Sequence, residues 1–206
     1  MPEIPRIISV DDHVVEPPDL WTSRLPAKYQ DRCPRVERDT ARFLFEGGVF
    51  SYEKGVEGGE QCDWWLYDDL VYPFPKLSAA AGFDQLDVVP VTFDDILPAS
   101  WKQKERLAAM DENHVDVSVC FPNVLPRFCG QAFLERDDKE LALLCVQAYN
   151  DWMIDEWCAG DGTGRLIPLT LIPLWDPIAA AVEIHRCADK GSFAVAFSEN
   201  PYPLGF

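Results

Sequence analysis

Four short apolar segments alternate with three amphipathic segments along the chain, and this order limits the fold more than any other feature. The apolar segments predict strands at residues 6–15, 115–121, 165–174 and 193–197. The amphipathic segments predict helices at residues 101–113, 134–157 and 177–190. Strands that alternate with helices in this way lie parallel and are joined by helical crossovers. The sequence therefore predicts an α/β fold built on a parallel sheet.

Residues 36–100, between the first predicted strand and the first predicted helix, have no steady period and are interpreted as one long inserted excursion. Within it, two apolar runs on either side of Glu46-Gly47-Gly48 predict a hairpin. Further along, Cys62–Tyr67 is a dense aromatic cluster. Excursions of this length are usually lids or interface arms. The aromatic cluster either packs the excursion onto the body, which is the preferred interpretation, or lines a pocket.

The first predicted strand ends in an acid-x-His pair, Asp11 and His13. Because successive side chains of a strand point to opposite faces, these two project to the same side. A carboxylate oxygen and an imidazole nitrogen are ligands that a divalent metal such as zinc accepts. The spacing alone leaves two other interpretations open, in which Asp11 is a buried partner of a core His13 or caps the turn that follows.

The composition disfavours some classes of partner and predicts a compartment. The 35 acidic and 18 basic residues give a net charge of −17, which disfavours binding to nucleic acids and anionic membranes. No apolar run reaches the roughly 18 residues of a membrane span. The seven cysteines are odd in number and lack C-x-x-C spacing, as in a reduced intracellular chain. The N-terminus has no signal-peptide pattern, so the expected compartment is the cytoplasm.

Residues 8–21, which contain Asp11 and His13, resemble the opening of the amidohydrolase-related family. Within that family they are most similar to the aminocarboxymuconate-semialdehyde decarboxylase-like branch. Three later segments, which resemble the second to fourth strands of that branch and their flanking helices, support the assignment: 106–123, 165–177 and 193–201.

This resemblance implies a fold and an activity. The fold is the N-terminal half of a distorted TIM-like (β/α)8 barrel, in which 1–206 is a partial barrel domain and 36–100 is inserted after the first strand. The activity is that of metal-dependent hydrolases and nonoxidative decarboxylases. Carried over to this chain, Asp11 and His13 are ligands of one divalent metal, zinc in most relatives. Many relatives have histidine where this chain has Asp11, and the harder aspartate oxygen leaves manganese, iron or magnesium as alternatives.

The rest of the family's metal site belongs to later strands. The resemblance places two histidines on strands five and six and an aspartate, the general base, on strand eight, all beyond Phe206. Four strand–helix units make half a barrel with two open sheet edges. We therefore expect the chain alone to be inactive and a longer protein to be the enzyme.

Two polar residues at predicted strand ends are candidate substrate contacts, because barrel active sites lie at the C-terminal ends of the strands. Asn123, after the second strand, is either a hydrogen-bonding group for the substrate or a turn residue. Glu199, after the fourth strand, is either a substrate contact or a solvent-facing loop acid. His114 and His185 lie away from predicted strand ends, so both are expected to be structural or on the surface.

The sequence thus favours a metal-dependent hydrolase or decarboxylase of the amidohydrolase superfamily that acts on a small substrate, aromatic or carboxylated. The alternative is a non-catalytic barrel fragment that serves as an interaction or assembly module. A phosphate-binding barrel is disfavoured because no glycine-rich phosphate loop is present. A small-molecule substrate is the expected ligand, and the acidic, aromatic-rich excursion is a surface through which a homodimer could form.

Overall fold

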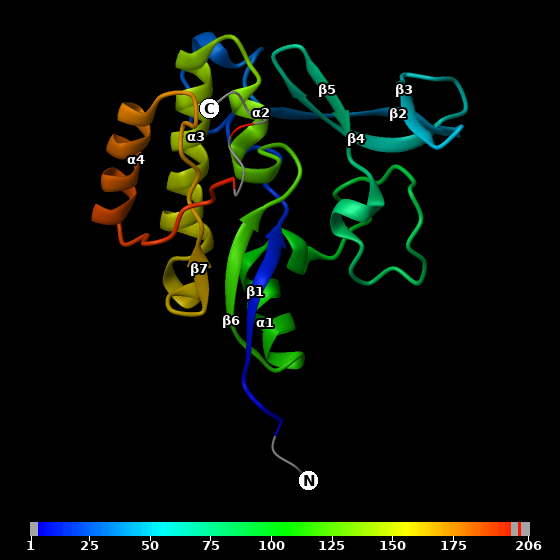
Figure 1. The fold of residues 1–206 in the computed structure, drawn as a ribbon. Coiled ribbons are helices and arrows are strands. Elements are labelled where there is room, and N and C mark those ends of the chain that lie inside the picture. The colour runs from blue at the N-terminus through cyan, green and yellow to red at the C-terminus, as the bar shows by residue number, and fades with distance from the viewer. Residues whose placement is uncertain (1–3, 199–201, 203–206) are drawn as a thin grey trace.

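The computed structural model describes residues 4–198 and residue 202. The main chain forms two sheets, a parallel one near the centre of Figure 1 and an antiparallel one at its upper right. The parallel sheet has the strand order β1-β6-β7, with the bounds Ile7–Val14, Val115–Pro122 and Leu166–Pro168. The predicted α/β fold with a parallel sheet is confirmed.

The antiparallel sheet is built from residues between β1 and the first helix. Its strand order is β3-β2-β4-β5, with the bounds Val49–Lys54, Arg35–Glu46, Glu60–Tyr67 and Leu70–Pro73. Gly47 and Gly48 join β2 to β3 with φ values of 58° and 82°, the left-handed backbone that a tight hairpin needs. The predicted hairpin is confirmed, but the sequence does not predict β4 or β5. Strand alternation is hidden in β4 because Trp64 and Trp65, on its opposite faces, are both fully buried.

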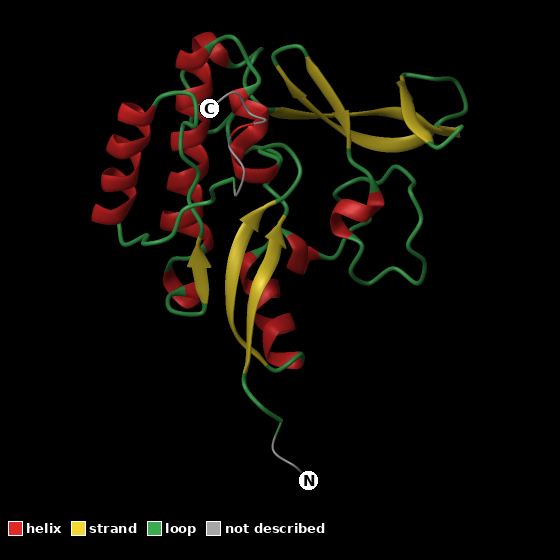
Figure 2. Cartoon of the chain, in the orientation of Figure 1, coloured by secondary structure: helices red, strands yellow, loops and turns green. Residues whose placement is uncertain are grey.

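Within the described residues, four α-helices accompany the two sheets (Figure 2). Their bounds are Gln103–Glu112 for α1, Gln131–Leu134 for α2, Lys139–Trp152 for α3 and Pro177–Asp189 for α4. The start of α4 follows the sequence prediction, since Asp176 accepts hydrogen bonds from the backbone N–H groups of Ile178 and Ala179. Pro177 occupies the first helical position, where a missing N–H has no cost.

The helix predicted at 134–157 starts later than expected and changes geometry at its end. The side chain of Asp138 accepts a hydrogen bond from Leu141 N at 3.0 Å, so Asp138 is the N-cap and α3 begins at Lys139. Beyond its last α-helical residue the chain continues as a π-helical turn over Met153–Trp157. A side-chain cap therefore overrides the helical pattern of the residues that precede it.

Two predicted strands are shorter than expected. The strand predicted at 165–174 makes ladder hydrogen bonds only over β7, because the prolines near both ends of that segment have no N–H to donate. The segment predicted as a strand at 193–197 forms a single parallel bridge, between Val195 and Thr170. It lies beside the chain that follows β7, but it has no ladder of its own.

Trp21 joins the antiparallel sheet to the helical body. Its indole is fully buried, and Nε1 donates to the carbonyl oxygen of Cys145, on α3, at 3.0 Å. The ring meets Trp65 of β4 edge-on, with centroids 5.7 Å apart, and Phe133 of α2 at 6.1 Å. Packing of the excursion onto the body, the preferred interpretation of its aromatic cluster, therefore holds for Trp65.

Asn150 ties α3 to the chain after β7 and to α4. Its buried Nδ2 donates to the carbonyl oxygen of Leu171 at 2.8 Å and to Glu183 Oε1 at 2.7 Å. Its Oδ1 accepts from Leu171 N at 2.8 Å. Glu183 is buried as well and is paired with Arg186 at 2.7 Å. One buried amide of α3 thus satisfies polar groups of two other elements in the interior.

Glu16 fixes the end of β1 to the residues that follow β6. Its carboxyl is fully buried, and its two oxygens accept hydrogen bonds from Asn123 N at 2.7 Å and Val124 N at 2.9 Å. Burial, opposed only in part by these hydrogen bonds, raises the pKa of Glu16 to about 7. The C-terminal ends of the two strands are therefore held together by one titratable group.

We expect Asn150→Leu to lower the free energy of unfolding by roughly 3 kcal/mol, because it removes both hydrogen bonds to the backbone of Leu171 and one of those to the buried Glu183 carboxylate. Urea denaturation of the two proteins measures the change. Gln147→Leu is the matched control, since this half-buried amide makes one long hydrogen bond of 3.5 Å to Glu183. Equal losses of stability in both variants would contradict the role assigned to Asn150.

Glu16 also predicts a pH dependence. The folded state binds its proton more tightly than the unfolded chain, in which the pKa is 4.5, so the stabilisation is complete below about pH 4.5 and is lost as pH rises through 7. We expect wild type to lose roughly 3 kcal/mol relative to Glu16→Gln between about pH 4 and pH 8. Urea denaturation across this range tests it, with the exposed Glu60→Gln as control. Parallel stability curves for wild type and Glu16→Gln would sink the prediction.

Candidate functional site

Asp11 and His13 lie together at the C-terminal end of β1. Their side chains project to the same side, with Asp11 Oδ1 3.7 Å from His13 Nε2. The pairing of β1 with β6 shifts register between Ser9 and Asp12, so β1 has a bulge at the site. Both side chains are open to solvent, with 81% of Asp11 and 50% of His13 exposed. The interpretation of Asp11 as a buried partner of a core histidine is therefore wrong.

Two contacts fix the orientation of His13. Its Nδ1 is 2.7 Å from the carbonyl oxygen of Pro122, at the end of β6. Because a carbonyl can only accept, Nδ1 carries a proton, and in the neutral imidazole Nε2 presents its lone pair on the side of Asp11. The backbone carbonyl of His13 accepts a hydrogen bond from Arg106 Nη2 at 2.9 Å. A histidine held through Nδ1 in this way has the arrangement of a metal-binding imidazole.

The geometry of this pair fits two ligands of a divalent metal. The distance of 3.7 Å between Asp11 Oδ1 and His13 Nε2 is too long for a hydrogen bond. It is close to the spacing of about 3.4 Å between two zinc ligands that lie at about 2.1 Å from the ion in tetrahedral geometry. Among the residues that the structure describes, no group of three or more His, Cys, Asp or Glu side chains is placed to hold a metal. The described chain therefore presents two suitable donors and not a complete ligand set.

Asp12 and Arg106 support the site, although no pattern in the sequence assigns a role to either. Asp12 Oδ2 accepts a hydrogen bond from Ser118 Oγ at 2.6 Å, so this carboxylate turns to β6 and not to His13. Burial lowers the pKa of Arg106, and the nearby charge of Asp12 opposes that shift. In the sequence Arg106 is recognisable only as a basic residue within the helix predicted at 101–113. Its partner, the backbone of His13, lies in a strand far away along the chain.

Asn123 lies after β6, beside the pair. Its backbone N–H donates to Glu16, and its Nδ2 donates to the carbonyl oxygen of Ser78 at 2.7 Å. These bonds fix the loop and orient the side-chain amide, so Asn123 has a turn-stabilising role whatever else it binds. Glu199, the other candidate substrate contact, lies outside the described residues. His185 is exposed on α4, away from the strand ends, as expected.

Two adjoining cavities open at this end of the parallel sheet. They share His13, Ser78 and Asn123 in their lining. The first, of about 520 Å³, also reaches Asp12 and Arg106. The second, of about 630 Å³, extends under the antiparallel sheet, where its lining is mainly apolar. Cavities of this size suit small molecules, and both begin at the candidate ligand His13.

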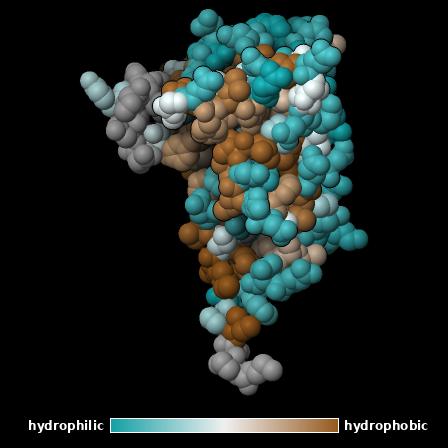
Figure 3. All heavy atoms as spheres, turned by 90° about the vertical axis from the view of Figure 1, so that its right-hand side faces the viewer, coloured by the Kyte–Doolittle hydropathy of each residue, from teal (hydrophilic) through white to brown (hydrophobic). Residues whose placement is uncertain are grey.

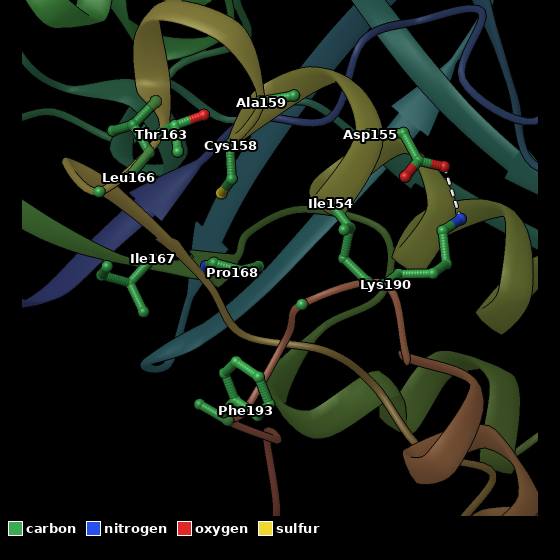
Figure 4. Close-up of a pocket in the computed structure, with 13 residues that line it drawn as sticks. Ile154, Asp155, Cys158, Ala159, Thr163, Leu166, Ile167, Pro168, Lys190 and Phe193 are labelled. Carbon is green, nitrogen blue, oxygen red and sulfur yellow. Dashed lines mark hydrogen bonds and ion pairs between the residues drawn. The ribbon is translucent and has the colours of Figure 1, made fainter. Parts of the chain in front are cut away.

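A third cavity, of about 780 Å³, lies away from these residues, against β7 (Figure 4). Its lining is largely apolar, and Lys190, its cationic side chain, is paired with Asp155. The hydrogen bond to Cys120, together with burial, raises the pKa of the Cys158 thiol, which disfavours a thiolate nucleophile there. The third cavity therefore has fewer groups that could bind a metal or react with a substrate than the end of β1 has.

No helix within residues 4–198 has the length and apolarity to cross a membrane. This finding agrees with the absence of a long apolar run in the sequence.

Comparison with known proteins supports a family assignment. Residues 63–203 match the family model described as Amidohydrolase, whereas no curated protein matches the chain. Among solved structures, an amidohydrolase from Mycobacterium avium subsp. paratuberculosis K-10 is similar, with a TM-score of 0.58 and 22% identity over 92% of this chain. The match covers 48% of that protein, so this chain spans about half its length, and at this identity the likeness supports the fold alone. Because the family model matches more than half of the chain, the chain belongs to the amidohydrolase family.

Proposed function

We propose that this chain supplies two metal ligands, Asp11 and His13, to a metal-dependent hydrolase of the amidohydrolase family that acts on a small substrate. One observation carries the proposal. His13 keeps Nδ1 on the carbonyl of Pro122 and places Nε2 3.7 Å from Asp11 Oδ1, which gives a converging nitrogen and oxygen donor. Zinc is the proposed metal, with manganese, iron or magnesium as alternatives because one donor is a carboxylate.

The chain's own residues prepare this position for a substrate carbonyl. When bound, a divalent metal polarises the carbonyl of an amide, ester or lactone toward attack by water. Arg106 holds the backbone of His13 and the Pro122 carbonyl holds its Nδ1, so the imidazole is oriented before substrate enters. Asn123, whose amide is oriented by Ser78, is the proposed hydrogen-bonding group for the substrate. Glu199 is the second proposed contact.

The proposed context is a (β/α)8 barrel. In it, β1, β6, β7 and the segment 193–197 are the first four strands, and 36–100 is an insertion after the first. Two findings support this proposal: the strands follow one another in chain order across the sheet, and the similar amidohydrolase of known structure is about twice as long. The remaining ligands and the general base then come from later strands of the whole protein.

The finer assignment that we propose is the aminocarboxymuconate-semialdehyde decarboxylase-like branch, in which loss of CO₂ is the alternative reaction. The same pair of ligands serves either chemistry. Products separate the two reactions. Release of CO₂ from a panel of hydroxybenzoates indicates a decarboxylase, and conversion of a lactone panel to hydroxy acids indicates a hydrolase.

An assembly module is the second candidate, and one observation favours it. Apolar side chains are exposed along the parallel sheet and beside it, among them Ile8 at 63%, Val10 at 67% and Phe193 at 89%. A non-catalytic barrel fragment that pairs with another chain covers such side chains. Metal content separates the candidates, because a pure module needs no metal.

We expect Asp11→Ala and His13→Ala to lower zinc affinity of the full-length protein by more than about 100-fold, since loss of a residue that merely orients a ligand costs 10- to 100-fold. Metal analysis after dialysis and turnover of the lactone panel measure the loss. His185→Ala and Asp189→Ala, two exposed residues on α4, are the matched controls and are expected to keep metal and activity. Full metal content and activity in either site variant would refute the ligand assignment.

A further inference from the structure

We propose that the cavity under the antiparallel sheet binds a flat, uncharged aromatic group of the substrate. The proposal rests on the hydrolase function proposed above and names what the substrate carries beside its reacting carbonyl. Amides and esters of aromatic carboxylic acids, with the ring on the carbonyl carbon, are the corresponding chemical class.

This aromatic cavity lies between the antiparallel sheet, the segment that follows β5 and the end of β1. Its apolar lining is Phe45, Phe50, Tyr72, Pro75, Leu77 and Val88. Its polar lining is confined to His13, Ser78 and Asn123, the residues that it shares with the neighbouring cavity. One end is therefore apolar and the other end reaches the candidate ligand His13, so a ligand that fills the cavity has an apolar end and a polar end.

The aromatic walls are held in place by contacts within the sheet. Phe50 packs nearly perpendicular to Phe43, with centroids 5.1 Å apart, and lies at 5.2 Å from Phe45 and 5.9 Å from Tyr52. The hydroxyl of Tyr52 donates to the carbonyl oxygen of Val71 at 3.0 Å, which fixes that ring as well. Walls that are ordered before binding lower the entropic cost of taking up a ligand.

The apolar side chains that line the aromatic cavity are ordered but remain exposed to solvent. Phe45 is 61% exposed and Leu77 is 50% exposed, although both are large apolar residues. Figure 3, which views the molecule from the side of the antiparallel sheet, shows apolar patches in the middle of this face with hydrophilic side chains around them. An apolar patch with a polar border is typical of a binding surface. An exposed aromatic ring can pack against a further ring in an edge-to-face or offset-stacked arrangement.

The charge of the lining restricts the ligand further. None of the described residues that line the aromatic cavity is Asp, Glu, Lys or Arg. A charged group placed there loses hydration without gaining a partner, so the group that occupies the apolar end is neutral. At the other end, the oriented amide of Asn123 and the imidazole of His13 suit a carbonyl group. The ligand therefore has an uncharged ring at one end and the reacting carbonyl at the other.

Binding of benzamide, cyclohexanecarboxamide and acetamide tests the proposal, with affinities measured by NMR titration of the protein. We expect benzamide to bind most tightly and Phe45→Ala to weaken benzamide binding about tenfold while leaving acetamide binding unchanged. Phe45→Tyr keeps the ring and is expected to retain binding. Phe193→Ala is the matched control, because this exposed phenylalanine lies in the third cavity.

Three results would overturn the aromatic cavity: benzamide binding unaffected in Phe45→Ala, equal affinity for cyclohexanecarboxamide and benzamide, or a dimer by sedimentation that Phe45→Ala dissociates. The last result assigns the face to a second copy of the chain. The proposed function fails separately. Benzamide binding that requires Phe45, without metal-dependent turnover in the full-length protein, keeps the aromatic cavity and refutes the hydrolase. Turnover that is equal for acetyl and benzoyl esters and unchanged in Phe45→Ala keeps the hydrolase and refutes the aromatic cavity.

Discussion

The parallel pairing of β1 with β6 positions every group at the candidate site. The register places His13 opposite Phe121 and Val14 opposite Pro122, so the imidazole reaches the Pro122 carbonyl. The same pairing brings the buried Glu16 to the backbone of the loop after β6. Because strand side chains alternate, a slip of one residue would turn the Asp11 and His13 pair to the helix-covered face. The positions of the site residues therefore depend on the register between β1 and β6, which packing elsewhere in the fold fixes.

The antiparallel sheet serves two purposes because its two faces differ. On one face Trp65 meets Trp21 and anchors the sheet to the helical body. On the other, Phe45 and Phe50 remain open beside the candidate site. For the aromatic cluster at residues 62–67, the sequence leaves packing and pocket lining as alternatives. In the structure Trp65 packs onto the body, and the aromatic side chains that line the cavity come from other strands of the excursion.

The sequence predicts most of the parallel half of the fold and little of what surrounds the site. Alternating strands and helices follow from local period, and the same-side projection of Asp11 and His13 follows from their spacing. The period fails for β4, where both faces are buried, and for residues 193–197, which form a single bridge and no ladder. Contacts such as Arg106 with the backbone of His13 join residues 93 positions apart, and nothing in a local pattern encodes that approach.

The bulge in β1 also separates two electrostatic environments. On the side of β6, Asp12 binds Ser118 and lies close to the Arg106 guanidinium. On the open side, the ion pairs of the described residues give Asp11 no lysine or arginine partner, only the His13 imidazole. A neighbouring guanidinium would neutralise Asp11 and repel an incoming cation, whereas Arg106 is turned to the opposite face. Together with a net charge of −17, which raises the local concentration of cations, this arrangement leaves the carboxylate at the end of β1 accessible to a divalent metal.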